Sequence, residues 1–137
     1  DILVLDLDFA KIGVSVCFDI KFPMLYRELI KKGAEIIVSP SAWSLVASAP
    51  AKEREIFTKT WEAMNICRAS ENLVYFVTSN LTGRTAPFLD SIGYSMITGP
   101  YGEVICNAKE KETGIYAELN MKIVRDLKGK VPVALME

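Results

Sequence analysis

The chain has 137 residues, half of them hydrophobic, which is enough apolar material for one sizeable core and gives no reason to expect two domains. Its 16 lysines and arginines and 17 acidic residues are scattered, so neither nucleic acid nor an anionic membrane is expected as a partner. The absence of histidine excludes Ser-His-Asp and Cys-His catalytic sites and HExxH zinc sites from the chain itself. Acid–base chemistry must therefore use carboxylates, lysine, tyrosine or cysteine.

The cysteines and the apolar runs indicate a cellular compartment. Cys17, Cys67 and Cys106 are too few and too unevenly spaced for a disulfide framework. No cationic and apolar leader precedes them, and no apolar run approaches the roughly 20 residues that span a bilayer. We therefore expect a soluble protein of the reducing cytoplasm.

The first elements in chain order are two short strands, expected over residues 2–7 and 11–17. A helix is expected over 24–32, because apolar side chains recur there at four-residue spacing. Pro23 suits the first turn of this helix, and Gly33 suits its end.

A continuous apolar run over 34–38 predicts a strand that is buried on both faces. Together with the preceding strand and helix it forms a βαβ unit, which implies parallel strands and a right-handed crossover. A loop is expected over 39–44, and a long amphipathic helix over 52–70, with Cys67 on its apolar stripe. A third buried strand, over 73–78, completes a second βαβ unit.

Glycine and proline become frequent after residue 79, which predicts short strands in antiparallel hairpins. These strands are expected over 94–98, 103–108 and 115–119. Asn120 can cap a last helix over 121–128, and residues 129–137 are expected to be a tail without a clear partner.

Cys17 is the candidate nucleophile. It follows a parallel strand just ahead of a helix, which is where open α/β sheets bind their ligands. Backbone N–H groups and the helix dipole at that point favour a thiolate. The alternative is a buried structural thiol, since free cysteine is among the most buried residue types, and position alone leaves both interpretations open. Cys67 and Cys106 are expected to be structural.

The segment KIGVSVCFDIKFP, with Cys17 at its centre, resembles the nucleophile segment of the nitrilase superfamily, the carbon–nitrogen hydrolases. That family's pattern is Cys-Tyr-Asp-x-Arg-Phe-Pro after a glycine-containing strand. Further matches follow in order along nearly the whole chain: SPSAW at 39–43, RASEN at 68–72, SN at 79–80, GYSMI at 93–97 and GPYG at 99–102. Phe18 replaces the family's tyrosine, and Lys21 replaces its arginine, which weakens a bidentate contact.

The resemblance implies an α/β fold, a four-layer α-β-β-α sandwich with mixed sheets, of which residues 1–137 supply roughly the second half as a single partial domain. It implies hydrolysis of a small amide, nitrile or N-carbamoyl compound through a thioester on Cys17. The backbone N–H of Phe18 would hold the oxyanion. The glutamate and lysine of the family's triad would lie outside this chain, in a missing N-terminal half of the domain, and no metal or organic cofactor is implied.

Three charged residues of the chain are not assigned a catalytic role. Lys11 begins its strand at the end opposite Cys17, and Lys21 occupies the position of an arginine that is chiefly structural in the family. Glu28 is expected to pair with Lys31 or Lys32 on its helix.

The same resemblance assigns Ser41, Ala42 and Trp43 to the substrate pocket, although the place of Trp43 after a strand is equally consistent with a core role. Arg68 and Glu71 are expected to form a structural polar cluster.

A homodimer or higher homo-oligomer is expected through the helix over 52–70. The family pairs its sandwiches through helices, and Phe57 and Trp61 extend the apolar stripe beyond what one core-facing side would bury. The alternative to an enzyme is an inactive, truncated half-domain that acts only through association with a partner chain.

Overall fold

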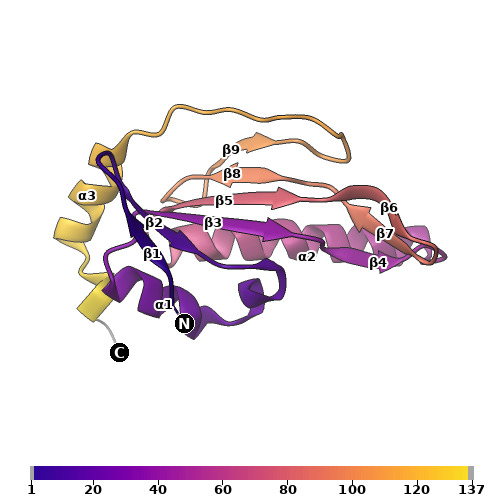
Figure 1. Ribbon diagram of the computed structural model, residues 1–137, viewed down its shortest axis with the longest axis horizontal. Helices are drawn as coiled ribbons and strands as arrows, with labels where there is room; N and C mark the ends of the chain where they lie inside the picture. Colours follow the sequence, from indigo (N-terminus) through magenta and orange to yellow (C-terminus); the bar gives the residue numbers. More distant parts are fainter. Residues whose placement is uncertain (1, 136–137) are drawn as a thin grey trace.

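The computed structural model describes residues 2–135 and is built around a six-stranded mixed sheet (Figure 1). Its strands, in spatial order, are β1 (Val4–Asp6), β2 (Lys11–Val14), β3 (Ile36–Ser41), β5 (Tyr75–Asn80), β8 (Met96–Thr98) and β9 (Val104–Asn107). β2, β3 and β5 run parallel to one another, whereas β1, β8 and β9 are antiparallel to their neighbours. The predicted α/β class, the mixed sheet and the parallel pairing of the βαβ units are therefore confirmed.

A small antiparallel sheet continues beyond the ends of β3 and β5 (Figure 1). Its strands are, in order, β4 (Ser44–Val46), β7 (Leu89–Ile92) and β6 (Thr82–Ala86). The sequence did not predict this sheet, because cross-strand polar contacts contribute to its pairing in place of a regular apolar alternation. The Ser91 hydroxyl lies 2.6 Å from that of Ser44 and donates to the Thr85 hydroxyl at 3.2 Å.

The helices are α1 (Pro23–Lys31), α2 (Ala51–Ser70) and α3 (Met121–Lys130), with two 3-10 helices, η1 (Cys17–Lys21) and η2 (Val133–Leu135). α1 and α2 pack on one face of the large sheet, where Leu29 and Trp61 join Ile37 and Phe76 in the main core. α3 lies at one end of the sheet (Figure 1) and packs its Val124 on the opposite face.

Local signals set the ends of two helices where the sequence predicted them. Pro23 occupies the first turn of α1, and Gly33 follows its end with a φ of 91°, in the left-handed region that glycine adopts without steric cost. The Asn120 side chain accepts a hydrogen bond from the Lys122 N–H at 3.1 Å and so caps α3.

The face of the sheet that carries α3 is only partly covered by residues 2–135. Leu5 of β1 is 43% exposed on this face, and Ile12, Val38 and Val77 are half-buried. The described residues thus form a helical layer, the large sheet, and a third layer limited to α3. The four-layer arrangement implied by the family resemblance stays a prediction.

β3 extends to Ser41 and β4 begins at Ser44, so the predicted loop over 39–44 is confined to residues 42–43. The ladder with β2 ends at Val14 and Val38, whereas the ladder with β5 continues to Ser41. Beyond Val38 one edge of β3 is therefore free of ladder bonds, and Pro40, which has no N–H to donate, is tolerated there.

Three expectations about other segments are also wrong. Residues 115–119 form no strand; they pass beside β9 as an irregular segment (Figure 1), where the Tyr116 carbonyl accepts from the Cys106 thiol at 3.2 Å. Cys67 is exposed rather than on a buried stripe of α2. The expected tail instead forms η2, whose buried Val133 accepts a hydrogen bond from Arg27 at 3.3 Å; its last two residues, 136 and 137, lie outside the described residues.

Within residues 2–135, no helix is both long and apolar enough to cross a membrane.

Candidate active site

Cys17 lies beyond the end of β2 and opens η1, so the strand is shorter than the predicted 11–17, whereas the predicted place of Cys17 between a parallel strand and a helix is confirmed. Its φ of 49° is in the left-handed region, which costs a residue with a side chain on the order of 1–3 kcal/mol. The Asp19 carboxylate accepts a hydrogen bond from the Val16 N–H at 2.8 Å, and the Asp19 N–H donates to the Val16 carbonyl at 3.0 Å. These reciprocal bonds stabilise the tight turn that separates Cys17 from the sheet.

The N–H of Phe18 lies in the first turn of η1, ahead of Asp19, whose N–H makes the first bond of that turn. The opening N–H groups of a helix have no acceptor within the helix itself. The Phe18 N–H therefore stays the candidate donor for an oxyanion, as the family resemblance predicts.

The helices behind the sheet hold η1 in place. Arg68 of α2 donates from Nε to the Ile20 carbonyl at 2.8 Å, and its Nη1 lies 2.7 Å from the Glu71 carboxylate. Its guanidinium also lies over the ring of Tyr26, 5.3 Å from the centroid. Burial raises the pKa of Tyr26 to about 12, and this neutral phenol donates to the Ser15 hydroxyl at 3.2 Å. The predicted structural role of Arg68 and Glu71 is confirmed.

A cavity of about 250 Å³ opens beside the nucleophile candidate. It is lined by Cys17, Phe18, Lys21, Ala42, Trp43, Ser44 and Phe57. The structure thus brings together two segments on which the sequence analysis placed site residues, η1 and the connection between β3 and β4. Ser41 is not part of this lining; it ends β3, where its hydroxyl donates to the Ser39 carbonyl at 3.4 Å.

Trp43 both lines the cavity and belongs to the core, so the two interpretations of this residue are compatible. Its ring stacks on Phe18, Phe57 and Trp61, with centroid distances of 6.2, 5.5 and 5.3 Å. The Asn80 side chain fixes the backbone of Trp43 by accepting its N–H at 2.7 Å. The buried indole N–H of Trp43 has no acceptor within residues 2–135, which is costly for a polar group.

Lys21 and Phe57 line the cavity, although the sequence analysis assigned neither to it. The Lys21 ammonium lies 5.0 Å from the centroid of Phe18 and 5.4 Å from that of Trp43, over the faces of both rings. The ion pairs formed among residues 2–135 do not include Lys21. The sequence could have indicated Phe57 through its spacing of four residues from Trp61, because this spacing places both rings on the side of α2 that faces Trp43.

Trp61 contradicts the packing argument for a dimer through α2. Its side chain is fully buried, and its indole N–H donates to the Tyr94 carbonyl at 2.9 Å. The sequence analysis expected this ring to contact a partner subunit. It instead packs in the core, against Trp43.

Lys11 and Glu28, the other two charged residues without an assigned catalytic role, are not part of the cavity lining. Lys11 pairs with Asp6 at 3.1 Å, at the start of β2. Glu28 pairs with Lys31 at 2.8 Å, as predicted for a helical surface pair.

Comparison with known proteins identifies the family. The model of the carbon–nitrogen hydrolase family matches residues 1–128. The chain belongs to the carbon–nitrogen hydrolase family. The segment around Cys17 and the motifs that follow it in order are therefore those of a true family member.

The relatives of this carbon–nitrogen hydrolase chain are about twice its length or longer. It is 31% identical to the omega-amidase NIT2 of Danio rerio, covering 91% of this chain and 42% of that protein. It is 32% identical to the deaminated glutathione amidase of Bos taurus, covering 90% of this chain and 35% of that protein. A carbon–nitrogen hydrolase structure from Helicobacter pylori G27 superposes with a TM-score of 0.84 at 26% identity, over 92% of this chain and 45% of that one.

Proposed function

We propose that the chain supplies the nucleophile of an enzyme that hydrolyses a small amide, with Cys17 attacking the carbonyl carbon. The observation that carries this proposal is the strained turn at Cys17, held by Asp19 beside a cavity with an aromatic wall. Backbone strain that surrounding hydrogen bonds stabilise is common at catalytic residues. The names of the two amidase relatives favour an amide over a nitrile or an N-carbamoyl compound.

The proposed reaction passes through a thioester. The Cys17 thiolate forms a C–S bond, and the N–H of Phe18 stabilises the oxyanion of the tetrahedral intermediate. Collapse of that intermediate breaks the C–N bond and releases ammonia or an amine, which takes up a proton. Water then attacks the thioester, releasing the carboxylic acid and regenerating the thiol.

The proton transfers require groups beyond those that line the cavity. Among residues 2–135 the lining contains no carboxylate, and the nearby Asp19 already accepts the Val16 N–H. We place the glutamate and lysine of the triad in a complementing N-terminal half, which would complete a four-layer sandwich. Two observations support this partner: the partly uncovered apolar face of the large sheet, and an alignment that covers only 42% and 35% of the two amidase relatives.

Further proposals concern assembly and location. We propose a homodimer or higher homo-oligomer through the outer side of α2, where Ile56 is 56% exposed. We also place the protein in the cytoplasm, because its three cysteines are free thiols.

The experiment that tests the function compares two cysteine variants in the protein reconstituted with its complementing half. Cys17→Ala should reduce ammonia release from small amides to background, with the folded state kept, because only the nucleophile is lost. Cys67→Ser, the matched control on the exposed side of α2, should keep most of the activity. Full activity of Cys17→Ala would refute the proposal.

The second candidate function is an inactive half-domain that acts only by association. The absence of a carboxylate from the described cavity lining favours it. If the chain binds a complementing half and the assembly still releases no ammonia from any amide, nitrile or ureido acid in a broad panel, this candidate replaces the enzyme.

A further inference from the structure

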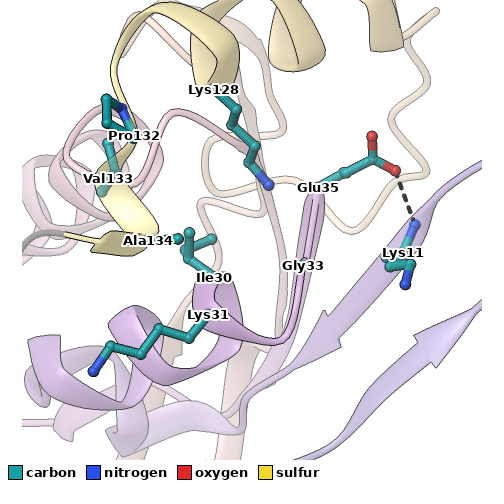
Figure 2. Close-up of a pocket in the computed structure, with 9 residues that line it drawn as sticks. All are labelled: Lys11, Ile30, Lys31, Gly33, Glu35, Lys128, Pro132, Val133 and Ala134. Atoms are coloured by element: carbon teal, nitrogen blue, oxygen red, sulfur yellow. Dashed lines mark hydrogen bonds between the residues drawn. The ribbon is translucent and has the colours of Figure 1, made fainter.

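A second cavity, of about 460 Å³, lies at the end of β2 that is remote from Cys17. α1, the residues ahead of β3, α3 and the segment with η2 surround it (Figure 2). Ile30 and Val133 give it apolar walls, and Gly33 contributes no side chain. Nothing in the proposed amide hydrolysis uses this space.

Lys128 extends from α3 into this cavity (Figure 2). Its ammonium donates to the Ala34 carbonyl. The nearby Glu35 carboxylate binds other groups, the Arg125 guanidinium at 2.8 Å and the Lys11 N–H at 3.1 Å. The hydrogen bond that Lys128 makes among the described residues is thus to a neutral carbonyl, without a carboxylate at ion-pair distance.

The other lysines around the cavity differ from Lys128. The Lys11 ammonium pairs with Asp6 at 3.1 Å, and the Lys31 ammonium pairs with Glu28 at 2.8 Å. Each of these ammonium groups thus has a carboxylate partner at ion-pair distance, which Lys128 lacks among the described residues.

Burial disfavours the charged form of Lys128 and lowers its pKa to about 8, although the charge of Glu35 acts in the opposite direction. At pH 7.5 roughly a quarter of such amines are unprotonated, compared with about one in a thousand for an ordinary lysine. The unprotonated amine is the nucleophilic form.

We propose that Lys128 is an acylation site, at which its free amine accepts an acyl group from a small activated donor, a thioester or an acyl phosphate, that enters the cavity. The amine nitrogen attacks the carbonyl carbon of the donor and forms a C–N bond. The C–S or C–O bond to the leaving group then breaks, and thiolate or phosphate departs with its electron pair. The proton lost by the nitrogen passes to solvent.

The product fits this site better than the ammonium does. An N-acyl lysine has no charge, so the cost of burying a cation disappears. It keeps one N–H, which suffices for the hydrogen bond to the Ala34 carbonyl. The acyl chain meets Ile30 and Val133, the apolar residues that line the cavity.

Lys130 is a matched reference, because it is exposed on the same helix two residues further along. The 137-residue chain is incubated with S-acetyl-N-acetylcysteamine or with acetyl phosphate, then unfolded and fully acetylated with a deuterated reagent. Cleavage at arginine leaves both lysines in one peptide, in which fragment masses give the extent of labelling at each. The same labelling in urea supplies the reference for the unfolded chain.

In the native chain at pH 7.5, at least one donor should acetylate Lys128 about tenfold or more faster than Lys130, because the larger free-amine fraction outweighs restricted access. In urea the two rates should converge. The rate at Lys128 should level off above about pH 8 to 9, because its amine is then mostly unprotonated. The donor that labels Lys128 shows whether a thioester or an acyl phosphate supplies the acyl group.

A variant separates this inference from general surface reactivity. Glu35→Gln removes the carboxylate whose charge favours the ammonium, so labelling of Lys128 at pH 7 should increase while that of Lys130 stays constant. A native ratio of Lys128 to Lys130 labelling equal to the ratio in urea, with both donors, would overturn the proposal. The labelling experiment does not measure amide hydrolysis. A negative result would therefore overturn the acylation of Lys128 without bearing on the proposed role of Cys17, and the reverse also holds.

Discussion

At Cys17 the backbone adopts a conformation that glycine would adopt at lower cost, and Asp19 is the residue that makes it stable. The carboxylate of Asp19 accepts the Val16 N–H, and its own N–H returns to the Val16 carbonyl. Because both bonds close around Cys17, they keep it out of the β2 ladder and beside the cavity. Asp19 therefore acts through the backbone, as a positioning residue for the proposed nucleophile.

Asp19→Ala removes the acceptor of the Val16 N–H and should lower the free energy of unfolding by about 1–2 kcal/mol. Activity of the complemented enzyme should fall further than this loss of stability explains, because the Cys17 turn relaxes. Urea unfolding and ammonia release measure the two effects. Asp126→Ala, which removes a carboxylate from an exposed pair with Lys122, is the control and should change neither. Unchanged activity in Asp19→Ala would show that this turn does not position the nucleophile.

At the scale of elements, one arginine links α2, η1 and α1. Arg68 donates to the Ile20 carbonyl of η1, pairs with Glu71 and lies over the Tyr26 ring of α1, while its side chain is only 9% exposed. The geometry of the candidate site therefore depends on α2 at a point far from the cavity lining.

Arg68→Met keeps much of the side-chain volume but leaves the Ile20 carbonyl without its charged donor. The free energy of unfolding should fall by about 2–3 kcal/mol, since hydrogen bonds from buried charged groups are worth more than neutral ones. Arg84→Met is the matched control, because Arg84 pairs with Asp90 on the surface and should cost less than about 1 kcal/mol. Equal losses in the two variants, measured by urea denaturation, would contradict this account.

The burial of Lys128 between α3 and the sheet predicts a pH dependence of stability. The folded pKa of Lys128, about 8, is below its unfolded value of 10.5. Below pH 8 both states bind the proton, and stability does not change with pH through this group. Between pH 8 and 10.5 the unfolded chain binds more protons, so stability rises with pH. After a discount for solvent screening, the gain from pH 8 to 10 should be on the order of 1–2 kcal/mol.

Lys128→Met provides the comparison for this titration, because it removes the group and keeps an unbranched side chain. Urea unfolding at a series of pH values should show the rise in the unmodified chain and a smaller rise, or none, in the variant. Identical slopes for the two proteins would show that Lys128 titrates alike in the folded and unfolded states.

The elements that the sequence predicted are those whose signals are local. α1 has Pro23 at its start, apolar residues at helical spacing and Gly33 after its end, and α3 has the Asn120 cap. β6 and β7 were missed because their pairing depends in part on polar contacts between distant residues such as Ser44 and Ser91. No local pattern specifies such a sheet.

In the candidate site too, the residues that a local motif marks were predicted, and those that depend on tertiary packing were not. Motif resemblance selected Cys17, Phe18, Ala42 and Trp43, which now line one cavity. Phe57 was assigned to a dimer contact and Cys67 to a buried stripe, because the sequence does not state how α2 is rotated about its own axis. That rotation is fixed by tertiary packing, in which Trp61 stacks on Trp43.

For the whole molecule, the distribution of exposed apolar surface indicates which face of the large sheet is incompletely covered. α1 and α2 cover one face of the large sheet with a dense core, whereas the other face is covered mainly at the end that α3 occupies. Exposed Leu3, Leu5 and Leu7 lie in and around β1, at the edge of the sheet. An exposed apolar strand at a sheet edge favours association with another polypeptide.

The chain expressed alone should therefore hydrolyse no amide, although it carries Cys17. Without the lysine of the proposed triad the oxyanion loses a charged partner, and removal of one such donor commonly costs about a hundredfold or more in rate. Without the glutamate no positioned base activates the thiol or the second-step water, a further loss of roughly a hundredfold to ten-thousandfold. Because both losses act on the same transition states, they need not multiply.

The measurement is ammonia release from small amides by residues 1–137 alone and by the same chain co-expressed with a complementing N-terminal half. We expect activity only in the co-expressed sample, together with a single complex in sedimentation, because the added half would cover the apolar face beside β1 and supply the proton-transfer groups. Cys17→Ala in that complex supplies the background rate. Turnover by the isolated chain would place the catalytic base within residues 1–137. Lys21 would then be the first residue to substitute, because it is the cation that lines the cavity with Cys17.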